Sequence, residues 1–463
     1  MHAFVISKQF EDRRRVGKRL PVFETSFTMG SGSQQSGVKH SRGVRGLLLM
    51  VMVFVTITQS LMHVQAITHP GDIEVLKEVK MALNASSIMN ASCMGSWDFA
   101  FDPCEARASA HFTCGIDCSL PVSGVSRIIG IRLETGAGYT GLLSPAVGNL
   151  TALQRLIVSG NNLHGPIPDT LGNCMELFQL DLSKNAFSGQ LPASLGLLST
   201  LSFFSVANNY LEGPIPDSFN QMKNLTYMYL DNNRLMGSIP SLAGMSTLSF
   251  LDASNNNLTG SLPSVPPQLS LLSLRKNQLT GPLPLSLKNL TFLQVLDVRE
   301  NKLNGSVFSF LFSMPNLQQM NLSYNQFTDV EPYNMSTGEK SELLSMDLSF
   351  NEIGGTLPEF LAEMQKLMVL ALRSNLFTGS IPYSYALKVA DPPNGTVRLG
   401  QLYMDDNYLT GSIPSPLLNL TLPDFRANFV RNCLESCPDT LSFCQGATQK
   451  TPAECNVPIV LPG

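Results

Sequence analysis

Apolar and polar positions recur with a period near 24 residues along most of the chain. Residues 156–174 read LIVSGNNLHGPIPDTLGNC, and residues 180–198, which begin 24 residues later, read LDLSKNAFSGQLPASLGLL. Leucine, asparagine, glycine and proline keep their places while the residues between them change. In Leu180-Asp181-Leu182 apolar and polar residues alternate, which predicts a strand with one buried side and one side facing solvent. Each repeat therefore predicts one short strand followed by a turn.

One asparagine marks each repeat at the same place in this frame. The asparagines are Asn161, Asn185, Asn209, Asn233, Asn256, Asn277, Asn301, Asn325, Asn351, Asn375 and Asn407. They are spaced by 21 to 26 residues, except for 32 residues between the last two. An earlier unit from Ile128 keeps the leucine frame but has Gly136 at the asparagine position, so residues 128–422 hold about 12 repeats. The frame LxxLxLxxNxLxGxIP with this period is the pattern of leucine-rich repeats.

Each invariant residue of the frame has a structural role. The Asn185 side chain offers a donor and an acceptor to backbone groups where the chain leaves the strand. Gly189 permits a turn that a Cβ would oppose, and Pro192 lies where no backbone donor is needed. A single repeat cannot fold alone, because its few buried side chains do not offset the cost of ordering its backbone. We therefore predict an α/β solenoid, a right-handed superhelix whose strands stack into a concave parallel sheet.

Two groups of cysteines flank the repeats, in caps that we place at residues 67–127 and 423–463. The candidates for disulfides are Cys93, Cys104, Cys114 and Cys118 before the repeats, and Cys433, Cys437, Cys444 and Cys455 after them. Each group allows three pairings, which the sequence leaves open. Zinc is the rival interpretation, but irregular cysteine gaps without a histidine pair are poor zinc spacing, so we predict no metal site. Cys174, inside a repeat, is expected to be a small buried hydrophobe.

The first cap also contains a helical pattern. We expect Asp72 to cap an amphipathic helix that covers the first repeat. The apolar residues of this helix are Val75, Leu76, Val79 and Leu83. The cysteine-rich tail is expected to cover the last repeat in the same way.

Residues 1–66 have the features of a secretory signal. A basic region precedes the apolar segment Leu47–Ile57, and small residues follow at Val64-Gln65-Ala66. We predict cleavage after Ala66 and a secreted protein of the extracellular space or cell wall. The alternative is an uncleaved anchor in the plasma membrane. Eleven Asn-x-Ser/Thr sequences agree with this compartment as candidates for glycosylation, namely Asn84, Asn90, Asn149, Asn224, Asn257, Asn289, Asn304, Asn321, Asn334, Asn394 and Asn419.

Charge and residue types exclude several functions. Residues 1–66 hold nine of the 31 Lys and Arg and three of the 35 Asp and Glu, so the remainder carries a net charge of −10. An acidic body argues against nucleic acid as a partner. His69, His111 and His164 are scattered and pair with no nucleophile in the repeat frame, and the glycines follow repeat turns instead of forming a phosphate loop. We therefore expect neither an enzyme nor a cofactor.

The outward strand positions are the candidates for a binding site. Phe203, Tyr227 and Phe250 share one column in adjacent strands, with Tyr229 beside them. The other candidates are Asp231, Asp252, Arg275 and Arg299. The aromatic residues suit a peptide or sugar site, or alternatively pack across strands to stiffen the sheet. The arginines could hold a carboxylate or could be solvated charges. A glycan at Asn321 in repeat nine would obstruct that section, which places the site in repeats four to eight.

The repeats resemble those of plant-type extracellular leucine-rich repeat proteins. This group includes the ectodomains of receptor-like kinases, receptor-like proteins and secreted relatives such as polygalacturonase-inhibiting proteins. The LxGxIPxxLGNL frame carries the resemblance, together with the leading cap from Trp97 through DPC at Asp102–Cys104 to FTC at Phe112–Cys114. It covers about residues 70–455. The chain departs from receptor-like members by ending at Gly463 without a membrane helix.

The resemblance implies recognition of an extracellular protein, a peptide or a cell-wall glycan through the concave face, in cell-surface signalling or defence. The partner could then be a membrane receptor kinase. Two alternatives are an inhibitor of a wall-degrading enzyme and a structural component of the cell wall that binds polysaccharide.

Overall fold

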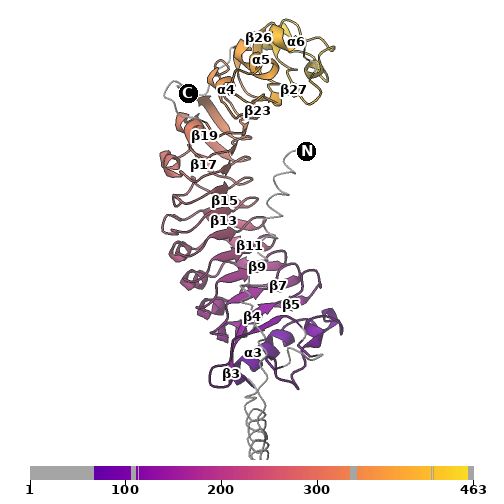
Figure 1. Cartoon of the computed structure of the whole chain (residues 1–463), viewed down its shortest axis with the longest axis vertical. Helices are drawn as coiled ribbons and strands as arrows, with labels where there is room; N and C mark the ends of the chain where they lie inside the picture. The colour runs from indigo at the N-terminus through magenta and orange to yellow at the C-terminus, as the bar shows by residue number, and fades with distance from the viewer. Residues whose placement is uncertain are drawn as a thin grey trace, which may run out of the picture. The chain divides into compact units, whose positions relative to one another are not determined.

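A computed structural model describes residues 67–105, 111–112, 114–333, 341–418, 420 and 422–456 (Figure 1). The predicted signal in residues 1–66 lies outside the described residues, as do the candidate glycosylation sites Asn334 and Asn419. Among the helices in this part of the chain, none has the length and apolar character that crossing a bilayer requires.

The repeats form one long sheet, as predicted. In spatial order its strands are β2 (Ile116–Cys118), β4 (Ile128–Arg132), β6 (Arg155–Ile157), β8 (Gln179–Asp181), β10 (Phe203–Ser205), β12 (Tyr227–Tyr229), β14 (Phe250–Asp252), β16 (Leu271–Ser273), β18 (Val295–Asp297), β20 (Gln319–Asn321), β22 (Ser345–Asp347), β23 (Val369–Ala371), β25 (Gln401–Tyr403) and β27 (Arg426–Asn428). Strand β2 pairs antiparallel with β4, and all the later strands run parallel. The leucine-rich repeat solenoid is therefore confirmed.

The described sheet has one more parallel strand than the twelve predicted repeats. The thirteenth is β27, which pairs with β25. Its repeat carries Phe425, Ala427 and Phe429 where other repeats have leucines, so the leucine frame does not reveal it. Asn432 completes this repeat at the asparagine position.

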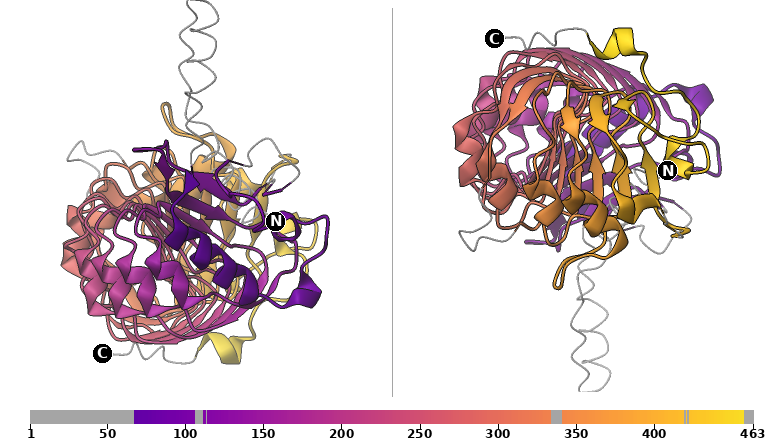
Figure 2. Two further views of the ribbon diagram at one scale, coloured as in Figure 1. Left: turned by 90° about the horizontal axis from the view of Figure 1, so that it is seen from below. Right: turned by 90° about the horizontal axis from the view of Figure 1, so that it is seen from above.

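The remaining elements form the other sides of the coils. The 3-10 helices of the repeats are η4 (Pro145–Asn149), η5 (Asp169–Asn173), η6 (Ala193–Leu197), η7 (Asp217–Gln221), η8 (Leu285–Asn289) and η9 (Ser309–Ser313), and α4 (Phe360–Glu363), α5 (Tyr383–Ala390) and α6 (Ser415–Leu418) continue this side. Smaller parallel sheets contain β5 (Thr140–Leu142), β7 (Asn162–Gly165), β9 (Ala186–Gln190), β11 (Tyr210–Gly213), β13 (Arg234–Ser238), β15 (Asn257–Thr259), β17 (Thr280–Gly281), β19 (Lys302–Val307), β21 (Gln326–Val330), β24 (Thr378–Ser380), β26 (Tyr408–Gly411) and β28 (Cys433–Leu434). Figure 2, which looks along the stack, shows the coils superimposed.

The core fills the space inside the coils and runs through the whole stack. In most repeats the inward residue of the strand is fully buried, as Leu180, Phe204 and Met228 are, whereas Ala427 in β27 is half-buried. A continuous line of such residues connects every repeat with its neighbours. This explains why the inward positions of the frame stay apolar, whereas the outward residues are free to vary.

A ladder of buried asparagines holds neighbouring repeats together. Asn185 Oδ1 accepts a hydrogen bond from the Leu163 backbone N–H in the preceding repeat at 3.0 Å, and its Nδ2 donates to Val158 O there at 3.0 Å. Twelve asparagines make this pattern, which are the eleven predicted ones and Asn432. They satisfy backbone groups that would otherwise be buried without partners.

Two glycine positions of the frame are set by geometry. Gly189 has φ +80°, a conformation in which a Cβ is strained, as predicted. Gly172, in the 3-10 helix, packs so closely on the next repeat that a Cβ would come within 2.7 Å of Ser194 O. The first glycine makes the turn and the second allows the coils to stack.

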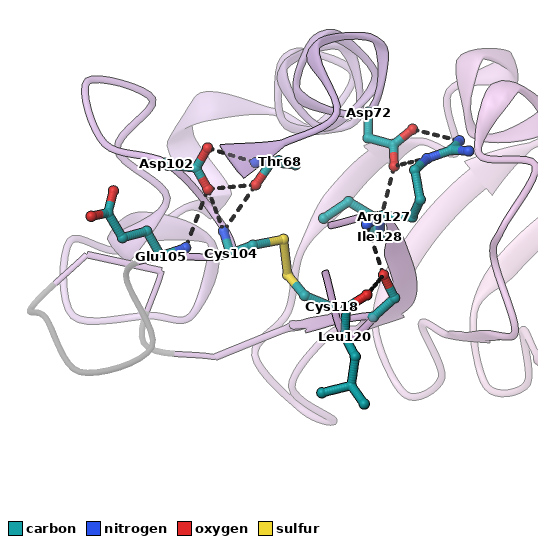
Figure 3. Close-up of a disulfide and its surroundings, with 10 residues drawn as sticks. Thr68, Asp72, Asp102, Cys104, Glu105, Cys118, Leu120, Arg127 and Ile128 are labelled. Carbon is teal, nitrogen blue, oxygen red and sulfur yellow. Dashed lines mark hydrogen bonds and ion pairs between the residues drawn. A yellow bond between two sulfur atoms is a disulfide. The ribbon is translucent and has the colours of Figure 1, made fainter. Parts of the chain in front are cut away.

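The first cap contains the predicted helix, but its N-cap is a different residue. Helix α3 (Pro70–Met81) buries Val75, Leu76 and Val79, and Leu83 after it is also buried. The N-cap is His69, whose Nδ1 accepts from Gly71 N, so the prediction of Asp72 as the cap was wrong. Because Asp72 lies inside the first turn, its carboxylate faces the start of the sheet. It accepts from Arg127 at two 2.9 Å contacts and from Ile128 N at 2.9 Å (Figure 3).

All eight predicted cysteines form disulfides within their own groups. The pairs are Cys93–Cys114, Cys104–Cys118, Cys433–Cys455 and Cys437–Cys444. The Cys104–Cys118 bridge lies beside Asp102, which accepts hydrogen bonds from Thr68 N and Thr68 Oγ1 (Figure 3). The caps further contain β1 (Ile67–Thr68), β3 (Val125–Ser126), η1 (Ala85–Ser87), η2 (Met94–Ser96), η11 (Ser442–Cys444) and α7 (Pro452–Cys455).

The ninth cysteine is buried, as expected. Cys174 lies in the core, and burial raises the pKa of its thiol to about 11. Its Sγ lies 3.5 Å from Val147 O. The thiol therefore packs as a small apolar group.

The long interval between Asn375 and Asn407 is filled by helix α5 and the turn after it. Lys388 of this helix is fully buried, and its Nζ donates to Met364 O at 2.5 Å and Val397 O at 3.1 Å. Burial lowers the pKa of Lys388 to about 8. The lysine thus ties the extra residues to the preceding repeat.

Candidate functional site

The register of the parallel strands arranges the outward side chains in columns. In the first column Phe203, Tyr227, Phe250, Leu271 and Val295 follow one another in adjacent strands. Gln179 precedes this series and Gln319 follows it. We call the five apolar residues the apolar stripe. It extends over repeats four to eight, the section that the sequence predicts as the site.

Four aromatic rings form one cluster at the start of the apolar stripe. The Tyr227 ring lies 4.8 Å from Phe250, 6.2 Å from Phe203 and 6.5 Å from Tyr229, measured between centroids. Phe203 and Tyr229 are 5.8 Å apart. Tyr227 is 37% exposed, and the other three rings are half-buried. The sequence thus correctly groups these four residues, and the cluster both stiffens the sheet and offers apolar surface.

Two pairs of rings in the cluster are nearly parallel. The planes of Tyr227 and Phe250 differ by 17°, and those of Tyr227 and Tyr229 by 12°. Tyr227 and Phe250 therefore turn one face toward each other, whereas the Phe203 ring is tilted by 43° to Tyr227 and by 48° to Tyr229. Tyr227, the most exposed of the four rings, offers a ligand its ring edge, which carries partial positive charge.

Leu271 and Val295 extend the stripe but were not among the predicted residues. Both are half-buried and have aliphatic side chains. The signal that could have found them is their place in the repeat frame, since they occupy the same column as Tyr227. An aliphatic residue attracts less notice in a leucine-rich sequence than an aromatic one does.

The aspartates of the second column serve the backbone. Their Oδ1 atoms accept from the backbone N–H two residues further along, at 3.0 to 3.3 Å, in Asp181, Asp252, Asp297 and Asp347. This bond closes a turn at the end of the strand. Asp252 of the predicted site therefore uses one carboxylate oxygen to hold the backbone.

Asp297 lies at the repeat-eight end of this site, close to several charged side chains. Burial raises the pKa of Asp297 to about 6, although Arg299 and Arg275 act in the opposite direction. Arg299 Nε is 3.9 Å from Asp297 Oδ1 and 4.0 Å from Glu300 Oε1. Both arginines are half-buried, beside the last residues of the apolar stripe. Repeats seven and eight therefore combine aliphatic surface with cationic groups.

Asp231 is buried, which corrects the expectation that it is an outward solvent-facing residue. Only 5% of it is exposed. Its Oδ2 accepts from Asn232 Nδ2 at 2.7 Å, so the neighbouring amide covers the carboxylate. Asp231 is thus placed to support the surface beside Tyr229 and has little area for a ligand.

The described glycosylation candidates lie mostly away from this column. Exposed asparagines outside the long sheet are Asn84, Asn90, Asn149, Asn224, Asn257, Asn289, Asn304 and Asn394. Asn321 lies in β20, the strand that follows the last strand of the apolar stripe. Within the described ranges no group of three His, Cys, Asp or Glu could hold a metal ion.

Sequence comparisons identify the repeat and its relatives. The family model described as Leucine Rich Repeat matches residues 152–174, 224–245, 247–269 and 268–290. Two probable leucine-rich repeat receptor-like serine/threonine-protein kinases from Arabidopsis thaliana are 29% and 28% identical over 127 and 123 residues. These segments make up 27% and 26% of this chain, but the chain spans only 12% of either kinase.

Solved structures resemble a larger part of the chain. A chain in the crystal structure of PEPR1–AtPEP1 is 29% identical in sequence to this protein, with a TM-score of 0.66. The match covers 83% of this chain and 55% of that chain. The leucine-rich repeat ectodomain of the Arabidopsis thaliana membrane receptor kinase GASSHO1/SCHENGEN3, in complex with CASPARIAN STRIP INTEGRITY FACTOR 2, is 28% identical with a TM-score of 0.66, over 78% and 44%. The Arabidopsis receptor kinase HAESA, with the peptide hormone IDA and the co-receptor SERK1, is 30% identical with a TM-score of 0.52, over 66% and 56%.

Proposed function

Because the chain is a leucine-rich repeat protein of the plant extracellular type, we propose that it binds an extended peptide or protein segment on the concave sheet. The binding surface is the apolar stripe and the charged groups at its far end. The observation that carries this proposal is the uninterrupted apolar series over repeats four to eight, with a ring cluster that reaches solvent at Tyr227. Exposed apolar surface of this kind on a soluble protein is typical of interaction sites.

The dimensions of the stripe fit a short peptide. Four steps between parallel strands at ~4.8 Å give a stripe of about 19 Å. An extended peptide places side chains of one face about 6.6 Å apart. The stripe therefore accommodates three such side chains, which corresponds to a segment of about five or six residues.

The stacked rings favour a peptide over a cell-wall glycan at this place. A sugar that stacks on an aromatic residue needs an open ring face, whereas Tyr227 and Phe250 turn one face toward each other. Ring edges, which carry partial positive charge, suit backbone carbonyls and carboxylates. Arg275 and Arg299, at the other end of the stripe, would pair with an acidic side chain or a terminal carboxylate of the peptide.

The relatives support the same class of ligand. HAESA was solved with a peptide hormone, and its ectodomain is among the structures that this chain resembles. A leucine-rich repeat ectodomain is typically a binding module without enzymatic activity, and we propose that role here. A role as an inhibitor of wall-degrading enzymes would use the same concave face, but no residue described above favours an enzyme over a peptide.

Selection from a displayed peptide library tests the proposal. We expect selected peptides to carry apolar side chains at every second position and an acidic group beyond them. Labelled synthetic peptides should then bind the purified protein in fluorescence anisotropy, and Tyr227→Ala combined with Tyr229→Ala should abolish this binding. Unchanged affinity in the folded double variant would contradict the proposal. A parallel array of wall glycans should give no binding that depends on these tyrosines.

A further inference from the structure

Asn321 is held in a conformation that leaves its amide nitrogen available. Of the described asparagines in Asn-x-Ser/Thr sequences, it alone lies in the long sheet. Its Oδ1 accepts from Ser323 Oγ at 2.7 Å and from Ser323 N at 3.1 Å. Since the amide group is planar, the Nδ2 points away from these donors. Ser323 of the Asn-x-Ser sequence thus holds the amide oxygen, and the amide nitrogen points away from Ser323.

An exposed pair of aromatic rings lies in the same and the next repeat. The rings of Tyr324 and Phe350 stack with centroids 4.1 Å apart and planes 11° apart. Their exposed fractions are 49% and 36%. We call them the aromatic pair. Unlike the cluster around Tyr227, the pair consists of two rings only, so each ring keeps an outer face that the other does not cover.

Both residues of the aromatic pair occupy a strained backbone position. Tyr324 has φ +55° and Phe350 has φ +57°. The residue before the ladder asparagine has this left-handed conformation in many repeats, where it is Lys184, Asn208, Asn232, Asn255, Lys276, Glu300, Ser374, Asp406 or Arg431. Bulky aromatic residues are outliers in this region, and small or polar residues make the same turn elsewhere in this chain. The turn itself therefore does not require the two rings.

We propose that Asn321 carries an N-linked glycan and that the aromatic pair is the platform on which its first sugars rest. In the transfer, Nδ2 loses a proton and bonds to C1 of the sugar. The C1–O bond to a lipid diphosphate donor breaks, and the diphosphate leaves. The attachment point is three residues from Tyr324, at most about 10 Å along the chain, so the first sugars are tethered within reach of the rings.

The glycan would also set the limit of the peptide site, a consequence that rests on the proposed function. Asn321 follows Asp297 and precedes Asp347 in the second column. The apolar stripe ends at Val295 in the adjacent strand, with Gln319 next to it. A glycan that leaves Asn321 toward the aromatic pair covers repeats nine and ten. The peptide is then confined to repeats four to eight.

Site occupancy is the first test. The full chain is expressed in eukaryotic cells that attach N-glycans, and glycopeptides are quantified by mass spectrometry. We expect occupancy at Asn321 in the wild type and in Ser323→Thr, which keeps the acceptor sequence. Asn321→Gln and Ser323→Ala should lose it, with the other sites unchanged. An unmodified Asn321 in the wild type would overturn the proposal.

The rate of glycan release is the second test. On the folded protein, an endoglycosidase should remove the glycan at Asn321 about fivefold faster in Tyr324→Asn with Phe350→Asn than in the wild type. The matched control is the exposed site Asn289, where the rate should not change. Equal rates at Asn321 would exclude the platform. Asparagine tolerates a left-handed backbone, so the melting temperature of this variant should not fall.

The two proposals can fail separately. Peptide affinity of the Tyr227 and Tyr229 variants tests the apolar stripe without reference to glycosylation. Occupancy and release rates at Asn321 test the glycan without any peptide.

Discussion

Removal of Tyr227 and Tyr229 together is the most direct test of the apolar stripe. Truncation of an aromatic anchor at the centre of an interface costs about 2 kcal/mol or more in binding free energy. The two truncations should therefore weaken peptide binding by about 4 kcal/mol, which corresponds to roughly a thousandfold rise in Kd. For a peptide that binds the wild type in the micromolar range, the double variant would show no binding in an ordinary titration.

The same change has a smaller effect on folding. It removes the four ring contacts among Phe203, Tyr227, Tyr229 and Phe250. Such contacts contribute about 0.5 to 1.5 kcal/mol each, and the lower end applies to rings that are partly in solvent. We expect a loss of about 2 kcal/mol of stability and a fall in Tm of roughly 4 °C or less for a chain of this length. The variant remains folded at the temperature of a binding assay.

The assay is fluorescence anisotropy of a labelled peptide at 20 °C, with circular dichroism to confirm folding. The matched control is Tyr210→Ala in β11, which removes an exposed tyrosine of a smaller sheet whose ring has the Arg234 guanidinium 5.0 Å from its centroid. This control should bind like the wild type. The reasoning is refuted if the folded double variant keeps its affinity within about threefold, or if Tyr210→Ala loses as much.

Three further predictions concern the scaffold and its charges. Asn277→Ala leaves the Leu258 backbone N–H without its 3.0 Å acceptor. This change should lower the free energy of unfolding by about 2 to 4 kcal/mol in denaturant titration. A fall in Tm of less than about 2 °C would contradict the role of the asparagine ladder. Gly172→Ala places a Cβ 2.7 Å from Ser194 O and should destabilise the protein by at least about 1 kcal/mol, measured in the same way. Asp297→Asn should be more stable than the wild type above pH 6, because burial raises the folded-state pKa of Asp297 to about 6 and penalises its ionised form. This advantage should disappear as the pH falls from 6 toward 4, and a difference that does not depend on pH would refute it.

Much of the fold can be predicted from the sequence because one frame is repeated many times. Buried positions tolerate few residue types, so their period is visible without an alignment, and the strand register follows from it. The thirteenth strand escapes this reasoning because Ala427 and Phe429 fill the same inward space as leucines do elsewhere. Asp72 shows another limit. Its position near a helix start suggests a cap, but its role depends on Arg127, which is 55 residues away and contacts it only in the folded chain.

The sequence predicts which residues of the candidate site share an outward column, but it does not predict how deeply each side chain is buried. The frame shows that Tyr227 and Phe250 face outward, and the structure confirms their contact. It does not show that Asn232 covers Asp231, because that depends on side-chain conformation at the end of a strand. The aromatic pair was missed for a related reason. The backbone angles of Tyr324 and Phe350 cannot be read from residue types, and without them the two rings are ordinary exposed residues.

A comparison of the residues that share one column of the sheet separates structural residues from functional ones. Aspartate recurs in the second column because its carboxylate accepts a hydrogen bond from the backbone N–H two residues later. Its frequent use there therefore has a structural reason. A residue that differs from the others in its column and costs free energy, through exposure or backbone strain, has no such structural explanation. Tyr227 leaves part of a ring in solvent, and Tyr324 adds backbone strain to exposure. Part of each cost is recovered when something covers the ring, and we propose that a peptide does so over the apolar stripe and a glycan over the aromatic pair.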